Sequence, residues 1–221
     1  GSYLARYLIK KKYSVTGIYR KKNFSNLKKL DLLKKINLEL VRKIEKKKIT
    51  KILKKNYHEI YFLSGQSSVT LSFKKSSETY ESQIKPLKLI LDFIVKQKTK
   101  KTKFLYASSA EIFGRISNKQ IINEESKKKP ISPYGLSKLI GYEIVKSYRQ
   151  MFKIPVSSAI LFNHESPLRN KNFIFKKIID SLEKIKNNKQ HKLKVGNIEI
   201  KRDWGWAPDY MEACYKILNS K

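Results

Sequence analysis

Short β-rich segments alternate with amphipathic helical segments along the chain, and this alternation limits the possible fold more than any other feature of the sequence. Residues 103–109 (KFLYASS) are expected to form a compact strand that ends in small polar residues, and residues 134–152 carry the apolar spacing of a helix. Further strands are expected at residues 13–19, 36–40, 58–65, 155–163 and 193–197. Further helices are expected at residues 2–11, 48–56, 78–97 (with Pro86 as an interior break), 172–187 and 208–218. Strands separated by such helices predict an α/β fold with a parallel sheet.

Composition excludes several classes of protein. A chain of 221 residues suits one domain or two small ones, and 40% hydrophobic residues supply a core. The single cysteine, Cys214, excludes a disulfide scaffold and a cysteine-rich zinc site, and we expect no metal. No apolar run approaches the about 20 residues of a membrane span, and no signal peptide opens the chain. We therefore expect a soluble, cytoplasmic protein with no membrane partner.

The charge raises the hypothesis of a polyanionic partner. Fifty basic residues against eighteen acidic ones give a formal net charge of +32. Surfaces that bind nucleic acid usually draw on arginine, whose planar guanidinium contacts phosphates and guanines bidentately, and only seven of the fifty basic residues here are arginine. We therefore interpret most of the charge as lysine on a solvated surface and expect no nucleic-acid partner. A basic nucleic-acid-binding protein remains the non-enzyme alternative.

Tyr134 and Lys138 carry the first chemical hypothesis. They are spaced i, i+4 at the start of an expected helix, so both lie on the same face. A nearby ammonium lowers the pKa of a phenol, which lets tyrosine act as an acid or base near neutral pH. The sequence ASSAE precedes them at the carboxyl end of an expected strand, where α/β sheets place ligand sites, and it supplies Ser109 and Glu111.

Together these residues resemble the Ser/Thr–Tyr–Lys triad of the extended short-chain dehydrogenases/reductases. Further blocks narrow the resemblance to the GDP-mannose 4,6-dehydratase family, in the family's order and over essentially the whole chain. The blocks are GSYLARYL (1–8), GIYR (17–20), EIYFLSGQSSV (59–69), ASSAEIFG (107–114), SPYGLSK (132–138), ILFNHESPLR (160–169) and RDWGWAPDY (202–210). The resemblance implies a Rossmann-like, doubly wound parallel sheet.

The resemblance also implies a reaction on GDP-mannose. Tyr134, helped by Lys138, would take the proton of the mannose 4-hydroxyl while hydride passes from C4 to the nicotinamide of NADP⁺. Glu111 would remove the C5 proton and help expel the 6-hydroxyl as water, after which the hydride returns to C6. The product is GDP-4-keto-6-deoxymannose. Ser109 stands where the family usually has threonine, and Asn163 is implied as a substrate contact.

Cofactor contacts follow from the same resemblance. Gly1 matches the last glycine of the family's phosphate-binding turn, and Arg20, at the end of an expected strand, favours the 2′-phosphate of NADP. Lys43-Ile44 replaces the family's adenine-binding Asp-Leu. The other implied cofactor residues are Leu63, Ser64, Gly65, Gln66, Ser67, Lys138, His164 and Arg169.

The blocks also bear on domain organisation. We expect a fragment that lacks the first strand of the sheet and most of the small C-terminal substrate domain. Residues 1–168 are expected to form a truncated NADP-binding domain, and residues 169–221 the start of the nucleotide-sugar-binding region. The complete enzyme is expected to be a homodimer or homotetramer. The enzyme alternative is another nucleotide-sugar epimerase or reductase of the same fold.

Overall fold

All strands that the structure describes pair in parallel, as the alternation of strands and helices predicts. The structure is a computed structural model that describes residues 1–97, 102–116 and 120–220. Three hydrogen-bonded groups occur within these residues, in the orders β1–β2, β3–β4–β5 and β6–β7. The strands are β1 Thr16–Tyr19, β2 Asn37–Leu40, β3 Glu59–Phe62, β4 Lys103–Ser109, β5 Val156–Leu161, β6 Asn163–Glu165 and β7 Trp204–Trp206.

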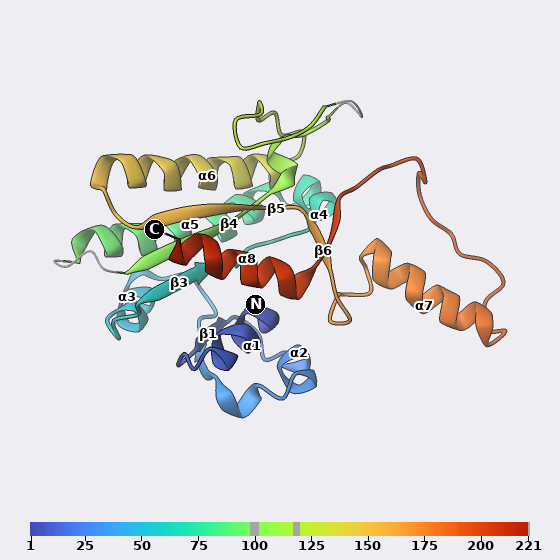
Figure 1. The fold of residues 1–221 in the computed structure, drawn as a ribbon, viewed down its shortest axis with the longest axis horizontal. Coiled ribbons are helices and arrows are strands. Elements are labelled where there is room, and N and C mark those ends of the chain that lie inside the picture. Colours follow the sequence, from blue (N-terminus) through green and yellow to red (C-terminus); the bar gives the residue numbers. More distant parts are fainter. Residues whose placement is uncertain (98–101, 117–119, 221) are drawn as a thin grey trace.

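Helices connect the strands and form the outer layers (Figure 1). The α-helices are α1 Ser2–Lys10, α2 Ser25–Lys29, α3 Lys46–Leu53, α4 Val69–Lys74, α5 Ser76–Lys96, α6 Pro133–Phe152, α7 Ile174–Lys186 and α8 Ala207–Asn219. Two short 3₁₀ turns are η1 Leu33–Lys35 and η2 Ala110–Ile112. The short elements α2, α4 and β7 were not predicted, because each is too brief to show a clear hydrophobic period.

Three local expectations are wrong. Residues 193–197 form no strand, since their side chains lie against solvent and no neighbouring strand pairs with them in the described chain. The strand expected at 155–163 divides at Phe162 into β5 and β6. Pro86 does not interrupt α5, which runs through it for 21 residues. The proline costs a backbone hydrogen bond, but it is buried and followed by fully buried Leu87, so packing holds the helix together.

The core lies on both faces of β3–β4–β5. On β4, Phe104 and Tyr106 point to one face, where they pack with α3, α5 and α6. Leu105 points to the other face and packs with α1 and α8, including Leu8 and Met211. This division follows from the two-residue period of a strand, and Figure 1 shows α5 and α6 on the opposite side of the sheet from α8.

The topology gathers loops at one edge of the sheet. Because β3, β4 and β5 are parallel, the segments that follow them all leave from the same edge. Helix α6 begins at this edge, where the Ser132 hydroxyl accepts a hydrogen bond from the Gly135 N–H at 3.0 Å and Pro133 fills the first helical position. Helix α7 extends away from this body and the chain returns to it through α8 (Figure 1).

Candidate functional site

The N-terminal turn of α6 lies directly against η2, which brings the predicted catalytic residues together. Gly135 permits this contact, because a Cβ atom there would lie 2.6 Å from the backbone oxygen of Glu111. Ser109 caps η2, its Oγ accepting a hydrogen bond from the Glu111 N–H at 3.3 Å. Ser109 lies close enough to Tyr134 to lower the pKa of its phenol. The structure therefore places Ser109, Glu111 and Tyr134 together beside the carboxyl end of β4.

Tyr134 differs from expectation in its acidity. Burial raises the pKa of the phenol, and the Glu111 carboxylate raises it further. Ser109 and the Arg169 guanidinium act in the opposite direction without reversing the shift. Lys138 was expected to lower this pKa, but here the effect of burial is larger. The side chain therefore rests as a neutral phenol.

Lys138 is buried one turn along α6 and turns its ammonium toward the sheet. Its Nζ donates a hydrogen bond to the backbone oxygen of Ala107 at 2.8 Å. The same atom lies 5.1 Å from the ring centroid of Tyr106 and 5.9 Å from that of Tyr134. Burial lowers the pKa of Lys138 to about 8. The lysine is therefore poised to change protonation state near neutral pH.

His164 and Arg169, which were predicted to contact the cofactor, lie near the same cluster. His164 stacks on Tyr210 with ring centroids 4.8 Å apart. Burial lowers the pKa of His164, and the positive charge of Arg169 contributes. This electrostatic interaction indicates that His164 and Arg169 lie near each other.

Arg169 is held by two residues that the sequence analysis did not select. Its Nε forms an ion pair with Glu165 Oε2 at 3.2 Å, and its guanidinium stacks 3.5 Å from the ring centroid of Phe173. Glu165 is buried. The i, i+4 rule could not have identified this carboxylate, because it applies to helices and Glu165 ends strand β6.

The loop from Leu63 to Ser67 is shaped by a contact with α5. Gly65 adopts a φ of +124°, and a Cβ there would lie 2.4 Å from the side chain of Gln83. Gln83 Nε2 donates to the backbone oxygen of Gln66 at 2.9 Å. Ser64 and Ser67 are exposed, so they face outward from the edge of the sheet. No sequence signal pointed to Gln83.

The remaining predicted residues lie apart from this cluster's contacts. Arg20 is exposed just after β1, and no hydrogen bond or ion pair joins it to another residue in the described ranges. Lys43 is also exposed, between β2 and α3. Asn163 begins β6, where it is half-buried and pairs in register with Trp204.

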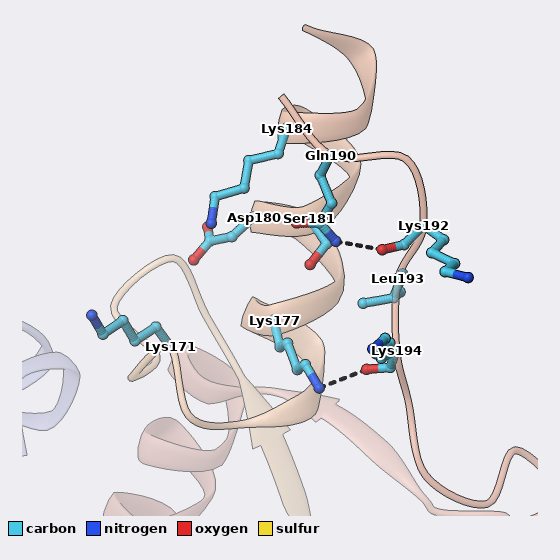
Figure 2. A pocket seen from close by; sticks show the side chains of 9 residues that line it. All are labelled: Lys171, Lys177, Asp180, Ser181, Lys184, Gln190, Lys192, Leu193 and Lys194. Carbon is cyan, nitrogen blue, oxygen red and sulfur yellow. Dashed lines mark hydrogen bonds between the residues drawn. The ribbon is translucent and has the colours of Figure 1, made fainter. Parts of the chain in front are cut away.

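A cavity of about 480 Å³ lies away from the cluster, between α7 and the segment that follows it (Figure 2). Lys177 Nζ donates to the backbone oxygen of Lys194 at 2.6 Å, and Gln190 Nε2 donates to that of Lys192 at 2.7 Å. The ammonium groups of Lys171 and Lys192 point away from each other in Figure 2. Lysines line this cavity, but their charges do not converge on one point.

The described residues contain neither a group of metal-ligating side chains nor a membrane-spanning helix. Within residues 1–97, 102–116 and 120–220, no three His, Cys, Asp or Glu side chains gather as metal ligands would. Over the same part of the chain, each helix is too short or too polar to cross a membrane.

Parallel strands with helices on both faces define a Rossmann-type fold, and the Tyr134–Lys138 pair lies beside the carboxyl end of β4. Solved structures share this fold at low sequence identity. A UDP-glucuronic acid 4-epimerase from Bacillus cereus matches with a TM-score of 0.83 and 22% identity, over 100% of this chain and 70% of that one. A dTDP-glucose 4,6-dehydratase from Streptomyces venezuelae matches with a TM-score of 0.85 and 18% identity, over 100% of this chain and 69% of that one.

The chain belongs to the GDP-mannose 4,6-dehydratase family, whose model matches residues 1–221. Curated members agree. The GDP-mannose 4,6 dehydratase of Drosophila melanogaster is 35% identical over 99% of this chain, and that of Homo sapiens is 34% identical over 100% of it. This chain spans 58% of the first protein and 62% of the second. The family inferred from the sequence blocks is therefore confirmed.

Proposed function

We propose that the chain carries the catalytic centre of a GDP-mannose 4,6-dehydratase, a lyase that converts GDP-D-mannose to GDP-4-keto-6-deoxy-D-mannose. The observation that carries this proposal is the position of Tyr134. It lies beside Ser109 and buried Lys138, and close enough to Glu111 for that carboxylate to raise its pKa. The function of the curated relatives supports it. The proposed substrate is accordingly GDP-mannose.

Tyr134 and Lys138 would begin the reaction. The phenolic proton of Tyr134 must first leave to solvent, and the phenolate then accepts the proton of the 4-hydroxyl while Ser109 hydrogen-bonds that hydroxyl. Because burial raises the pKa of Tyr134, the phenolate needs a positive charge beside it when it forms. Protonated Lys138 supplies this charge. Because burial lowers its pKa to about 8, Lys138 can also release its own proton near neutral pH.

Glu111 would distinguish a dehydratase from a plain oxidoreductase. Oxidation at C4 acidifies the proton on C5, and a second base must then remove it before the 6-hydroxyl can leave as water. Glu111 is half-buried and close enough to Tyr134 to raise its pKa. An epimerase or reductase of the same fold has no elimination step for this carboxylate to serve.

A nicotinamide dinucleotide fits the residues around Gly1. Helix α1 begins there without a side-chain cap, so its first N–H groups can bind a phosphate. Arg169 adds a guanidinium already oriented by Glu165 and Phe173. When bound, the nicotinamide would supply the redox chemistry at C4 and C6. The loop from Leu63 to Ser67, with His164 and Lys138, would hold the rest of the cofactor.

NADP is the form of the cofactor that we propose, on the basis of Arg20. A guanidinium after β1 can bind a 2′-phosphate through charge-assisted hydrogen bonds, which contribute roughly 1.5–3 kcal/mol. Arg20→Ala should therefore reduce the preference for NADP⁺ over NAD⁺ by about 10-fold to 100-fold. Dissociation constants for both cofactors measure this, and an unchanged preference contradicts the role of Arg20.

We also propose the organisation of the whole enzyme. Residues 1–168 would form the cofactor-binding unit, and residues 169–221 would open the nucleotide-sugar-binding region. Helix α8, at the end of the second range, packs on α1 and β5, so the two regions would share a core. A homodimer or homotetramer in the cytoplasm is the assembly that we expect.

The proposal can be tested in a chimera in which residues 1–221 replace the matching part of the Vibrio cholerae relative, which is 34% identical. Tyr134→Phe should abolish oxidation at C4, because no base remains for the hydroxyl proton. Glu111→Gln should still form reduced nicotinamide, but release of dehydrated product should fall by about 10²–10⁴. Single-turnover absorbance and exchange of the C5 hydrogen with deuterated water separate the two steps.

The two variants also discriminate between functions. A Glu111→Gln enzyme that exchanges C5 and releases product at the wild-type rate would contradict the dehydratase mechanism and favour an epimerase or reductase. Lys51→Ala, on the exposed face of α3 and outside the proposed site, is a control for general damage and should leave the elimination step intact.

A further inference from the structure

Tyr106 is a buried titratable side chain to which the reaction assigns no role. It lies on β4 and has no solvent exposure. Its hydroxyl is buried and has no hydrogen-bond partner within the described residues. An unpartnered buried hydroxyl is costly, so the position of this ring needs another explanation.

The ring of Tyr106 is fixed by shape from two sides. Phe62 stacks on it with centroids 6.0 Å apart and planes 21° apart. On α6, Gly141 leaves room for its outer end, because a Cβ atom there would lie 2.3 Å from the Tyr106 hydroxyl. A ring enclosed in this way cannot turn aside without moving α6 or the sheet.

Lys138 lies against this fixed ring. Its Nζ is 5.1 Å from the Tyr106 centroid, closer than to the Tyr134 ring at 5.9 Å. The Ala107 backbone oxygen holds the same atom at 2.8 Å. An ammonium within about 6 Å of an aromatic centroid is attracted to the ring, most strongly where both groups are buried.

We propose that Tyr106 is a positioning residue for Lys138. The Tyr106 ring stabilises the Lys138 ammonium and keeps it beside Tyr134. Its consequence for the reaction rests on the function proposed above. With the Ala107 carbonyl, the ring fixes the charge of Lys138 at the place where the Tyr134 phenolate would form. The hydroxyl of Tyr106 has no part in this role.

The charges around Lys138 make the effect measurable. Among the groups that can titrate near Lys138, Tyr134 lies on the same helix and Tyr106 lies on β4. Glu111 and Arg169 change the pKa of Tyr134 in opposite directions. Burial is what lowers the pKa of Lys138. The ring opposes this effect, so an electron-poor ring should lower the pKa of Lys138 further.

A graded series at position 106 tests the proposal in the chain as it stands. Phenylalanine, 4-fluorophenylalanine and 3,4,5-trifluorophenylalanine are introduced at position 106 by amber suppression, with lysine labelled at Cε with ¹³C. A lysine that titrates near pH 8 is separated from the ordinary value of about 10.4, and Lys138→Met identifies its signal. From phenylalanine to the trifluoro residue, the acid ionisation constant of Lys138 should rise by roughly threefold to tenfold.

Phe104 provides the matched control, because it lies on the same face of β4 and stacks on Phe62. The same fluorinated residues at position 104 should leave the titration of Lys138 unchanged. A flat series at position 106, or an equal shift from position 104, overturns the proposal. If the fluorinated chains do not fold, Tyr106→Leu compared with Tyr106→Phe decides, since equal ionisation constants in these two variants also overturn it.

The same series in the chimera separates this inference from the proposed function. Activity that needs the Lys138 ammonium is lost as pH rises through its pKa, so the alkaline limb should move to lower pH with fluorination. A titration that shifts in a chimera without dehydratase turnover supports the role of Tyr106 and contradicts the proposed function. A limb that stays fixed while the titration shifts contradicts the role of Tyr106 in the reaction.

Discussion

The cluster of predicted site residues around Tyr134 and the α7 segment (residues 170–203) both contain lysine, but the two regions differ in how deeply the fold buries it. In the cluster, Lys138 is buried against β4 and its pKa falls to about 8. In the α7 segment, the lysines line an open cavity, and apolar side chains on the same helix are exposed, such as Leu182 at 56%. The same residue type becomes a chemical group in one region and a solvated charge in the other, because only the first region is enclosed by the sheet.

The largest expected difference between the two regions is in packing energy. Leu91→Ala, on α5 in the core, should lower the free energy of unfolding by about 2–5 kcal/mol, because it leaves a cavity beneath the sheet. Leu182→Ala, on exposed α7, should change it by less than about 0.5 kcal/mol. Urea unfolding followed by circular dichroism measures both. Comparable losses would mean that α7 is packed in solution, which would contradict the difference in burial between the two regions.

Charge burial gives the next difference, with a defined sign. The pKa of Lys138 is lowered from 10.5 to about 8 in the fold, so the unfolded chain binds more protons between these values and stability should rise with pH there. Relative to Lys138→Met, the wild type should gain up to about 3 kcal/mol between pH 8 and pH 10.5. Lys184→Met, on the exposed α7, is the control. A flat difference across this range would mean that Lys138 is solvated.

Glycines sharpen the same contrast on a smaller scale. Gly141→Ala should cost about 1–3 kcal/mol, since the new Cβ would meet the fixed ring of Tyr106. Gly196→Ala, in the α7 segment, has open space around it and should be nearly neutral. Tyr106→Leu combined with Gly141→Ala should lose less than the sum of the single variants. If the losses measured by thermal unfolding are strictly additive, Gly141 and Tyr106 do not interact, which contradicts this prediction.

The smallest expected effect concerns two tyrosines at the same core. Tyr106→Phe removes an unpartnered hydroxyl and should leave stability unchanged or raise it by about 1 kcal/mol. Tyr148→Phe removes a hydroxyl that donates to Asp92 at 2.5 Å and should lower stability by about 1 kcal/mol. Chemical unfolding of both variants is the measurement. A loss at Tyr106 as large as that at Tyr148 would reveal a hidden partner for its hydroxyl.

Sequence patterns predicted the elements that carry the site because those elements have strong periods. The strand at 103–109 and the long helix from Tyr134 appear almost where expected. Residues 193–197 were predicted to form a strand but have no partner strand among the described residues. A strand without a neighbour cannot form the ladder of backbone hydrogen bonds that stabilises a sheet. Local pattern is therefore a sufficient guide only where the topology supplies a pairing edge.

Within the site, sequence spacing identified residues but not their electrostatics. The i, i+4 spacing of Tyr134 and Lys138 placed both on one face, as expected. The direction of the Tyr134 pKa shift was wrong, because burial raises it and the Lys138 ammonium is directed to the Ala107 carbonyl. Depth below the surface is not encoded in spacing along a helix.

The sequence by itself determined the parallel α/β architecture, the family and the candidate catalytic residues, because periodicity and motifs are properties of neighbouring residues. Only the tertiary structure selected Tyr106, Gln83 and Gly141, whose partners lie on other elements of the fold. Their contacts join β4 to α6 and α5 to the loop after β3, over separations that no local pattern records. Burial, and with it the acidity of Lys138, exists only once those elements pack together.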